Sequence, residues 1–306
     1  MKVAALAGGV GGAKLLVGLQ EALDPRDLTA IVNTADDAEI YGLHISPDVD
    51  IVTYWLAGLA DTDRGWGIKG DTFTIVEALG RLGVETWFRL GDRDLGTCLY
   101  RTNRLQDGGS LSEITAEVAA RLEVATKILP MSNDAVRTEV LTSDDRRLKF
   151  QEYFVRERTE PEVADVHFEG IDHAVPAPGV VEAIGAADRV IVCPSNPIVS
   201  IGPILGVEGV RQALRSHPSV MAVSPIIRGS ALKGPADRLL ASLGFRSTAS
   251  GVADLYRDFC NVFVLDSTDE GEIEKVESAG MTGVATNTIM RDTQTSALLA
   301  GTLLQI

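Results

Sequence analysis

Four glycines near the N-terminus have the spacing that most directly suggests chemistry. The stretch LAGGVGGAKLLVGL, between a short apolar run and a segment of helical character, contains Gly8, Gly9, Gly11 and Gly12. Glycines let backbone N–H groups approach an anion closely, and the N-terminus of a helix adds a partial positive charge. The pattern therefore predicts a phosphate-binding loop, with a tight turn that binds no ligand as the alternative.

This loop matches neither of the two common phosphate-binding motifs. A P-loop needs Ser or Thr after its lysine, because that hydroxyl holds Mg²⁺, whereas Leu15 follows Lys14 here. A dinucleotide fingerprint needs G-x-G-x-x-G, and Lys14 stands at the third glycine position counted from Gly9. A phosphate must therefore be neutralised by backbone N–H groups, by Arg or Lys side chains, or by a divalent cation.

Carboxylates follow the next predicted strand. Asp36 and Asp37 come directly after LTAIVNTA, and Asp50 ends the segment ISPDVD. Magnesium takes one or two carboxylates together with phosphate oxygens and water, so this placement beside the glycine loop favours a functional role. A cap or turn is the simpler interpretation for three further residues, Asp61, Asp63 and Asp71.

Two more segments offer groups that could bind a nucleotide. Arginines surround the segment RLGDRD, namely Arg89, Arg93 and Arg101. They could clamp a phosphate, stack on a flat ring, or form a surface network with the aspartates. The segment CPSNPIVSIGPIL places Ser195 and Asn196 on a chain that prolines make rigid, which suits recognition of a nucleobase or phosphate.

The elements that must position these residues alternate between strand and helix. Strands are predicted at residues 3–7, 28–37, 85–94, 189–197, 220–227, 261–269 and 283–290. Helices are predicted at residues 14–23, 50–60, 71–83, 110–124, 236–244, 251–259 and 293–305. Asp71 or Thr72 is expected to cap the third of these helices, and Ser110 or Ser112 the fourth.

This order predicts an α/β fold: a Rossmann-like, mostly parallel sheet with helices on both faces. Residues 136–155 read as a β-hairpin that 162–170 could extend, so we expect a smaller inserted subdomain at 128–175 within a core of 1–127 and 176–306. Ligands bind beyond the C-terminal ends of parallel strands. The glycine loop, NTADD, RLGDRD, CPSNP and SPII should therefore meet in one crevice.

Composition excludes several classes of function. The 306 residues carry a net charge of −15, which argues against non-specific binding to nucleic acid. No apolar run could span a membrane, no signal peptide is apparent, and the three scattered cysteines fit a reducing cytoplasm. No Ser-His-Asp or Cys-His arrangement stands out. Phosphoryl transfer by positioning and electrostatics is the chemistry that remains.

Several segments together resemble one family across nearly the whole chain. GGVGGAKLLVGL, VNTADD, ISPDVDIVTYWLAG, DRGWGIKGDTF, LGDRD, LPMSND, FQEYFV, PSNPIVSIGPIL and VSPII are similar to the 2-phospho-L-lactate transferases of coenzyme F-420 biosynthesis, whose bacterial members use phosphoenolpyruvate. The resemblance implies a dimeric, magnesium-dependent enzyme. Its donor is a guanosine diphosphate that carries lactate or enolpyruvate, its acceptor is the deazaflavin Fo, and GMP is released.

The resemblance also implies roles for individual residues. Asp50 and Arg89 would contact Fo, and Asp50 would orient or deprotonate the attacking hydroxyl. Asp36 and Asp50 would hold magnesium. The diphosphate would lie on the glycine loop, and the guanosine end would be held by Ser195 and Asn196. Lactate, enolpyruvate and glycerate all remain open as the acid of the donor.

Two other functions compete with this interpretation. Related proteins with a similar glycine loop bind nucleotide sugars and regulate cell-wall growth and carbon metabolism, and such a protein would have no affinity for Fo. A NAD-dependent oxidoreductase is the other alternative. The broken G-x-G-x-x-G and the lack of a clear catalytic acid weigh against that alternative.

Overall fold

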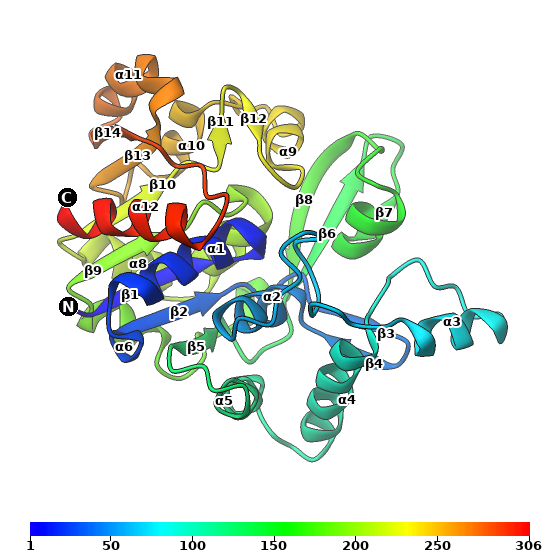
Figure 1. Ribbon diagram of the computed structural model, residues 1–306. Coiled ribbons are helices and arrows are strands. Elements are labelled where there is room, and N and C mark those ends of the chain that lie inside the picture. The colour runs from blue at the N-terminus through cyan, green and yellow to red at the C-terminus, as the bar shows by residue number, and fades with distance from the viewer.

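A seven-stranded parallel sheet forms the centre of the molecule (Figure 1). The computed structural model describes all residues, 1–306. The strand order is β14–β13–β10–β9–β1–β2–β5, and every neighbouring pair is parallel. The strands are β1 (Val3–Ala7), β2 (Leu28–Val32), β5 (Lys127–Pro130), β9 (Arg189–Val192), β10 (Val220–Val223), β13 (Val262–Asp266) and β14 (Thr282–Thr286). The predicted fold class is confirmed.

Helices cover both faces of this sheet because its strands are apolar on both sides. Along β1, Ala4 and Leu6 pack into one core, and Val3 and Ala5 pack into the other. The core that contains Val3 and Ala5 includes α1 (Gly9–Ala22), α2 (Pro47–Leu56), α5 (Leu111–Arg121) and α12 (Thr293–Gln305). The core that contains Ala4 and Leu6 includes α6 (Val180–Ala186), α7 (Gly202–Gly206), α8 (Val210–Ser216), α9 (Ala236–Ser242), α10 (Ala249–Tyr256) and α11 (Ile273–Ser278).

The direction of chain progression reverses between β1 and β9. From β1 the sheet continues through β2 to β5 on one side, and from β9 through β10 and β13 to β14 on the other. Ligands of open α/β sheets bind at such a switch point, outside the C-terminal ends of the strands. The glycine loop follows β1 and the CPSNP segment follows β9, so both lie at this point.

A three-stranded antiparallel sheet lies within residues 128–175, where the insert is predicted. Its strands are β6 (Arg137–Thr142), β7 (Arg147–Lys149) and β8 (Val163–Glu169), with β6 in the middle. The predicted hairpin is present, although its second half continues as a short helical turn at Glu152–Arg156. Residues 128–130 belong to β5 and pair with β2 in the main sheet. The division of the chain into domains otherwise stays a prediction.

Besides the three-stranded sheet, another region projects from the main sheet (Figure 1). It contains β3 (Ala38–Ile40), β4 (Leu43–Ile45), α3 (Thr74–Arg81) and α4 (Asp92–Gln106). The strand predicted at 85–94 is wrong, because residues 85–91 form no strand and Asp92 begins α4. The last short strands, β11 (Ile226–Ile227) and β12 (Ser230–Ala231), form a hairpin. No helix of the chain combines the length and the apolar character that a membrane crossing requires.

Helices α3 and α4 exchange their N-terminal caps, which local sequence patterns do not show. The N-cap position of α3 is Phe73, so the predicted caps Asp71 and Thr72 are wrong. Asp92, from the start of α4, accepts the N–H groups of Thr74 and Ile75 at the start of α3, with N···O distances of 3.1 and 2.9 Å. Asp71 in turn accepts N–H groups from the first turn of α4. By contrast, the predicted Ser110 cap of α5 is confirmed and forms a capping box.

Candidate functional site

A cavity of about 710 Å³ lies at the switch point of the sheet, and it brings the predicted segments together. Its lining includes residues of the glycine loop and of the NTADD, PDVD, RLG, CPSNP and SPII segments. The predicted convergence on one crevice is therefore confirmed. Of the predicted site residues, the lining contains Gly8, Gly9, Gly11, Asp36, Asp50, Arg89, Ser195 and Asn196, but not Gly12.

The glycines allow helix α1 to begin in close contact with the turn after β9. A Cβ atom on Gly11 would collide with the carbonyl oxygen of Pro194, and one on Gly12 would lie 2.7 Å from Ser195 Oγ. Gly9 has a φ of +62°, in the left-handed region that favours glycine. Helix α1 starts at Gly9, five residues before the predicted start, because this packing accommodates the glycines inside its first turn. Binding of an anion by this loop stays a prediction.

Ser195 and Asn196 use their side chains differently. Ser195 Oγ accepts the N–H of Gly8 at 3.0 Å and donates to the carbonyl oxygen of the same residue at 2.7 Å. The Asn196 Oδ1 atom accepts the N–H groups of Ile198 and Val199, whereas its buried Nδ2 has no partner. The Ser195 hydroxyl thus holds the glycine loop in place, and the Asn196 amide keeps an unused N–H donor.

Asp48 is a buried pocket residue to which sequence reasoning gave no role. Its Oδ1 accepts the N–H of Gly9 at 2.9 Å, and its Oδ2 accepts Nδ2 of Asn33 at 3.0 Å. Burial raises the pKa of Asp48 to about 6, although both hydrogen bonds oppose the shift. Its position in the same PDVD segment as Asp50 was the only sequence signal. A carboxylate therefore occupies the start of α1, where a phosphate was expected.

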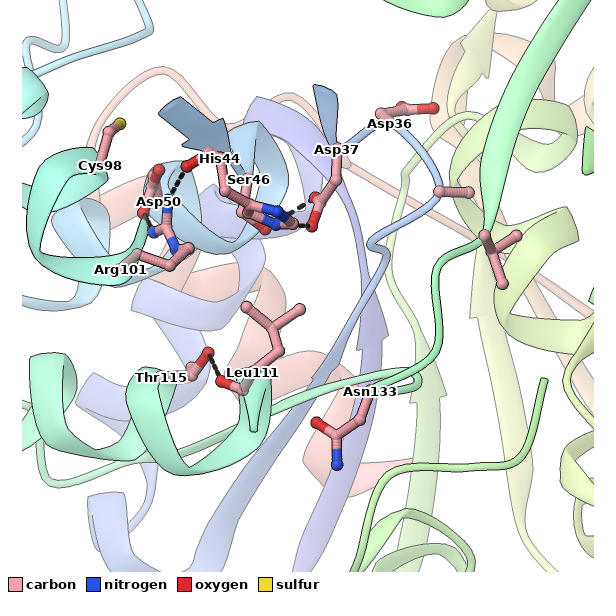
Figure 2. Close-up of polar contacts among 12 residues, drawn as sticks. Asp36, Asp37, His44, Ser46, Asp50, Cys98, Arg101, Leu111, Thr115 and Asn133 are labelled. Atoms are coloured by element: carbon pink, nitrogen blue, oxygen red, sulfur yellow. Dashed lines mark hydrogen bonds and ion pairs between the residues drawn. The ribbon is translucent and has the colours of Figure 1, made fainter. Parts of the chain in front are cut away.

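Asp36 has no partner that compensates its charge. Its Oδ1 is buried without a hydrogen bond, and in Figure 2 its carboxylate points away from the network around Asp37. Burial raises the pKa of Asp36 well above its usual range, and the nearby Asp48 carboxylate raises it further. Two neighbouring buried carboxylates with an unused oxygen are the ligands that Mg²⁺ prefers, so these residues fit the ion that the family resemblance implies.

Asp37 has a structural environment instead. Its carboxylate accepts Ser46 Oγ at 2.7 Å and lies 2.9 Å from Nε2 of His44 (Figure 2). These contacts join the loop after β2 to strand β4 and to the start of α2. The Asp37 carboxylate therefore stabilises the arrangement of these three segments.

Asp50 forms a buried ion pair with Arg101 of α4 (Figure 2). Arg101 also donates to the carbonyl oxygen of His44 at 3.2 Å. Burial raises the pKa of Asp50, and the Arg101 guanidinium opposes that shift. Of the two predicted magnesium ligands, only Asp36 is thus without a compensating charge. Asp50 still lines the pocket, and its contact with a substrate hydroxyl stays a prediction.

Asp94 is a second acidic pocket residue that the sequence did not single out for a role. The Tyr54 hydroxyl donates to its Oδ1 at 2.9 Å. Burial raises the pKa of Asp94 to about 7, and the neighbouring Asp50 carboxylate adds to the shift. Ligand atoms of Asp50, Asp94 and Cys98 lie within 4.8 Å of one another. Burial also raises the pKa of the Cys98 thiol, so this group stays protonated and is a poor metal ligand at neutral pH.

This raised pKa predicts that protonation of Asp94 contributes to stability. Between about pH 4 and 7 the folded chain keeps a proton on Asp94 that the unfolded chain releases, so the free energy of unfolding should fall as pH rises. The difference in unfolding free energy between wild type and Asp94→Asn should decrease by about 1 kcal/mol per pH unit from pH 5 to 7, measured by urea titration. Asp258→Asn is the control. Arg211 and Arg215 hold the pKa of Asp258 at about 2, so the difference in unfolding free energy between wild type and Asp258→Asn should stay constant from pH 5 to 7. A constant difference for Asp94→Asn would contradict the assignment.

Arg89 belongs to a row of flat side chains along the pocket. Its guanidinium carbon lies 4.6 Å from the ring centre of Phe73, and that of Arg64 lies 5.2 Å from the same ring. Arg64 also lies 5.1 Å from the ring centre of Trp66, which is 38% exposed. Arg64, Trp66 and Arg89 all line the cavity. This row offers stacking surfaces to a planar ligand.

Comparison with known proteins decides the family. The model of the family described as 2-phospho-L-lactate transferase CofD matches residues 3–302. The chain belongs to this family. Membership makes it a transferase of coenzyme F-420 biosynthesis, as the resemblance implied.

Relatives with two different names are similar to this transferase along its full length. A phosphoenolpyruvate transferase of Streptomyces griseus is 41% identical over 312 residues, covering 100% of this chain and 98% of the relative. A 2-phospho-L-lactate transferase of Methanosarcina mazei is 39% identical, covering 97% and 98%. Nearly equal identity to both means that overall similarity does not select the acid of the donor.

A solved structure supports the fold alone. A Bacillus halodurans protein of the UPF0052 family superposes with a TM-score of 0.66 at 17% identity, covering 99% of this transferase and 98% of that chain. The shared architecture is the α/β sheet with its helices.

Proposed function

We propose that this transferase moves a 2-phospholactyl or phosphoenolpyruvyl group from a guanosine-diphosphate-activated donor to the terminal ribityl hydroxyl of Fo. The hydroxyl oxygen forms a bond to the distal phosphorus of the donor. The bond from that phosphorus to the bridging oxygen breaks, and GMP leaves with this oxygen. A regulatory protein that binds nucleotide sugars is the alternative.

One observation carries the proposal: acidic, cationic and flat side chains line the same switch-point cavity. Asp48 presents its carboxylate at the first turn of α1 and Asp36 lines the same cavity, whereas Arg64, Trp66 and Arg89 present stacking surfaces. A phosphate near the uncompensated carboxylates requires a cation between them. The flat row suits a tricyclic ring such as that of Fo.

The residues of this chain would prepare the reaction by position and charge. Asp50 would accept the proton of the attacking hydroxyl, and its burial, which raises its pKa, makes it a better base. Arg101 fixes the orientation of that carboxylate. The unpartnered Asn196 amide would donate to the guanosine part of the donor. Arg89 would stack on Fo.

Asp36 and Asp48 would hold magnesium. When bound, this ion would neutralise the negative charge that collects on the phosphate oxygens during transfer. The two carboxylates would in turn be held in their charged form, which burial alone disfavours. We further propose that the enzyme is a homodimer and acts in the cytoplasm.

The decisive experiment is a fluorescence titration of the purified protein with Fo, with and without GDP and Mg²⁺, followed by an assay of GMP release. We expect saturable binding of Fo. GMP release should need both Fo and Mg²⁺ and should stop in EDTA. Supplying the lactyl, enolpyruvyl and glyceryl donors in turn identifies the acid. Absence of Fo binding under every condition would contradict the proposal and favour the regulatory alternative.

A further inference from the structure

The same pocket contains two lysines that form no ion pair. Lys14 lies on α1, Lys233 lies in the loop between β12 and α9, and both line the cavity. Neither forms an ion pair with a carboxylate. The chain has 43 acidic and only 28 basic Lys and Arg side chains, so carboxylates are in excess. Two ammonium groups without an ion pair in one pocket therefore require a specific explanation.

The two ammonium groups lie close enough to repel each other. Burial lowers the pKa of Lys14 and the positive charge of Lys233 lowers it further, whereas the Asp292 carboxylate only partly opposes this shift. Lys14 Nζ donates to the carbonyl oxygen of Met290 at 2.8 Å, which fixes its position. Like charges held together are unfavourable unless an anion lies between them.

Gly65 leaves space for the second ammonium group. A Cβ atom at this position would collide with Nζ of Lys233, and Gly65 has a φ of +84°. The loop that carries Lys233 is thus in contact with the loop that carries Arg64 and Trp66. Lys233 itself is exposed, so it can turn toward a ligand that enters the cavity.

The start of α1 supplies less positive charge than the glycine cluster suggests. Asp48 takes the N–H of Gly9, and the Ser195 hydroxyl takes the N–H of Gly8. A phosphate group in this cavity must therefore obtain part of its positive charge from side chains. An ammonium group supplies that charge and up to three N–H donors.

We propose that Lys14 and Lys233 together form a phosphate-binding site that holds one phosphate of the donor. The identity of the donor rests on the proposed function. The site itself requires only a phosphate or diphosphate anion, so it can be tested with inorganic pyrophosphate and no nucleotide. Lys14 provides the fixed half of the site and Lys233 the half that comes from the opposing loop.

The test measures the affinity of the full chain for inorganic pyrophosphate in the absence of magnesium. Calorimetry gives the dissociation constant, and tryptophan emission gives a local signal, because the Trp55 ring lies 6.0 Å from Lys14 Nζ. Lys14→Met and Lys233→Met should each weaken binding about tenfold, as expected for loss of a charged hydrogen bond. Lys69→Met removes the same charge from an exposed position outside the cavity lining and should change binding less than about twofold.

Charge reversal separates this site from general electrostatics. Lys233→Glu should pair with Lys14 and weaken pyrophosphate binding more than Lys233→Met does. Because Lys233 is exposed, both Lys233 variants should unfold at the same urea concentration as wild type. Lys14→Met should unfold at a lower urea concentration, because it also loses the hydrogen bond to Met290. The proposal would be overturned if Lys233→Met and Lys69→Met bound pyrophosphate with the same affinity. It would also be overturned if the wild-type protein bound no pyrophosphate. If the lysine effects appear but Fo does not bind, the proposed function fails and the anion site stands.

Discussion

Asp36→Asn is expected to make the protein more stable and the enzyme much less active. The Asp36 carboxylate is buried with one unpartnered oxygen, and burial raises its pKa well above the usual range. An amide of the same shape removes that penalty, so the free energy of unfolding at pH 7 should rise by about 1 kcal/mol. The gain should shrink as pH falls, because wild-type Asp36 then becomes protonated. Loss of a magnesium ligand should lower kcat/KM about 100-fold or more and raise the Mg²⁺ concentration needed.

Asp37→Asn is the matched control for this prediction. Its carboxylate already accepts Ser46 Oγ and contacts His44, so the substitution removes charge from a satisfied site. Unfolding free energy should fall instead of rising, and the dependence of the rate on Mg²⁺ should stay near that of wild type. Urea unfolding and initial rates over a range of Mg²⁺ concentrations measure both quantities. An Asp36→Asn variant with unchanged activity and unchanged Mg²⁺ dependence would rule out Asp36 as a ligand.

Arg101→Met is expected to lower the free energy of unfolding by about 3–5 kcal/mol, since it leaves the Asp50 carboxylate buried without a partner. Arg101 and Asp50 are both buried, and they form their ion pair within the wall of the cavity. The double variant Asp50→Asn/Arg101→Met removes both charges and should recover a large part of this loss. Denaturant titration of the four proteins gives the interaction energy directly.

The surface pair of Arg246 and Asp254 provides the comparison. Both side chains are about half exposed, so Arg246→Met should cost less than about 1 kcal/mol. A similarly small effect of Arg101→Met would contradict the importance of the buried pair. This pair also changes the expectation for Asp50→Asn. That variant should lose stability as well as activity, because it leaves Arg101 buried without its partner.

Much of the fold followed from local patterns of the sequence. Short apolar runs alternating with amphipathic segments identified six of the seven strands of the main sheet, whereas β5 was not predicted as a strand. Parallel strands end at one edge, so the segments after them had to meet, and the glycine loop and CPSNP do so at the switch point. The strand predicted at 85–94 failed because its apolar residues pack against the projecting region and not within a sheet.

Sequence alone determined the family, the α/β class and the segments that form the cavity, because each depends on residue types and short spacings. Tertiary structure decided how each carboxylate is used. Asp50 is neutralised by Arg101, 51 positions away, and Asp37 is satisfied by His44 and Ser46. Asp36 and Asp48 form no ion pair, and the charges of Lys14 and Lys233 act on each other within one pocket. The physical reason is that the charge state of a buried group depends on its neighbours in space, which chain separation does not reveal.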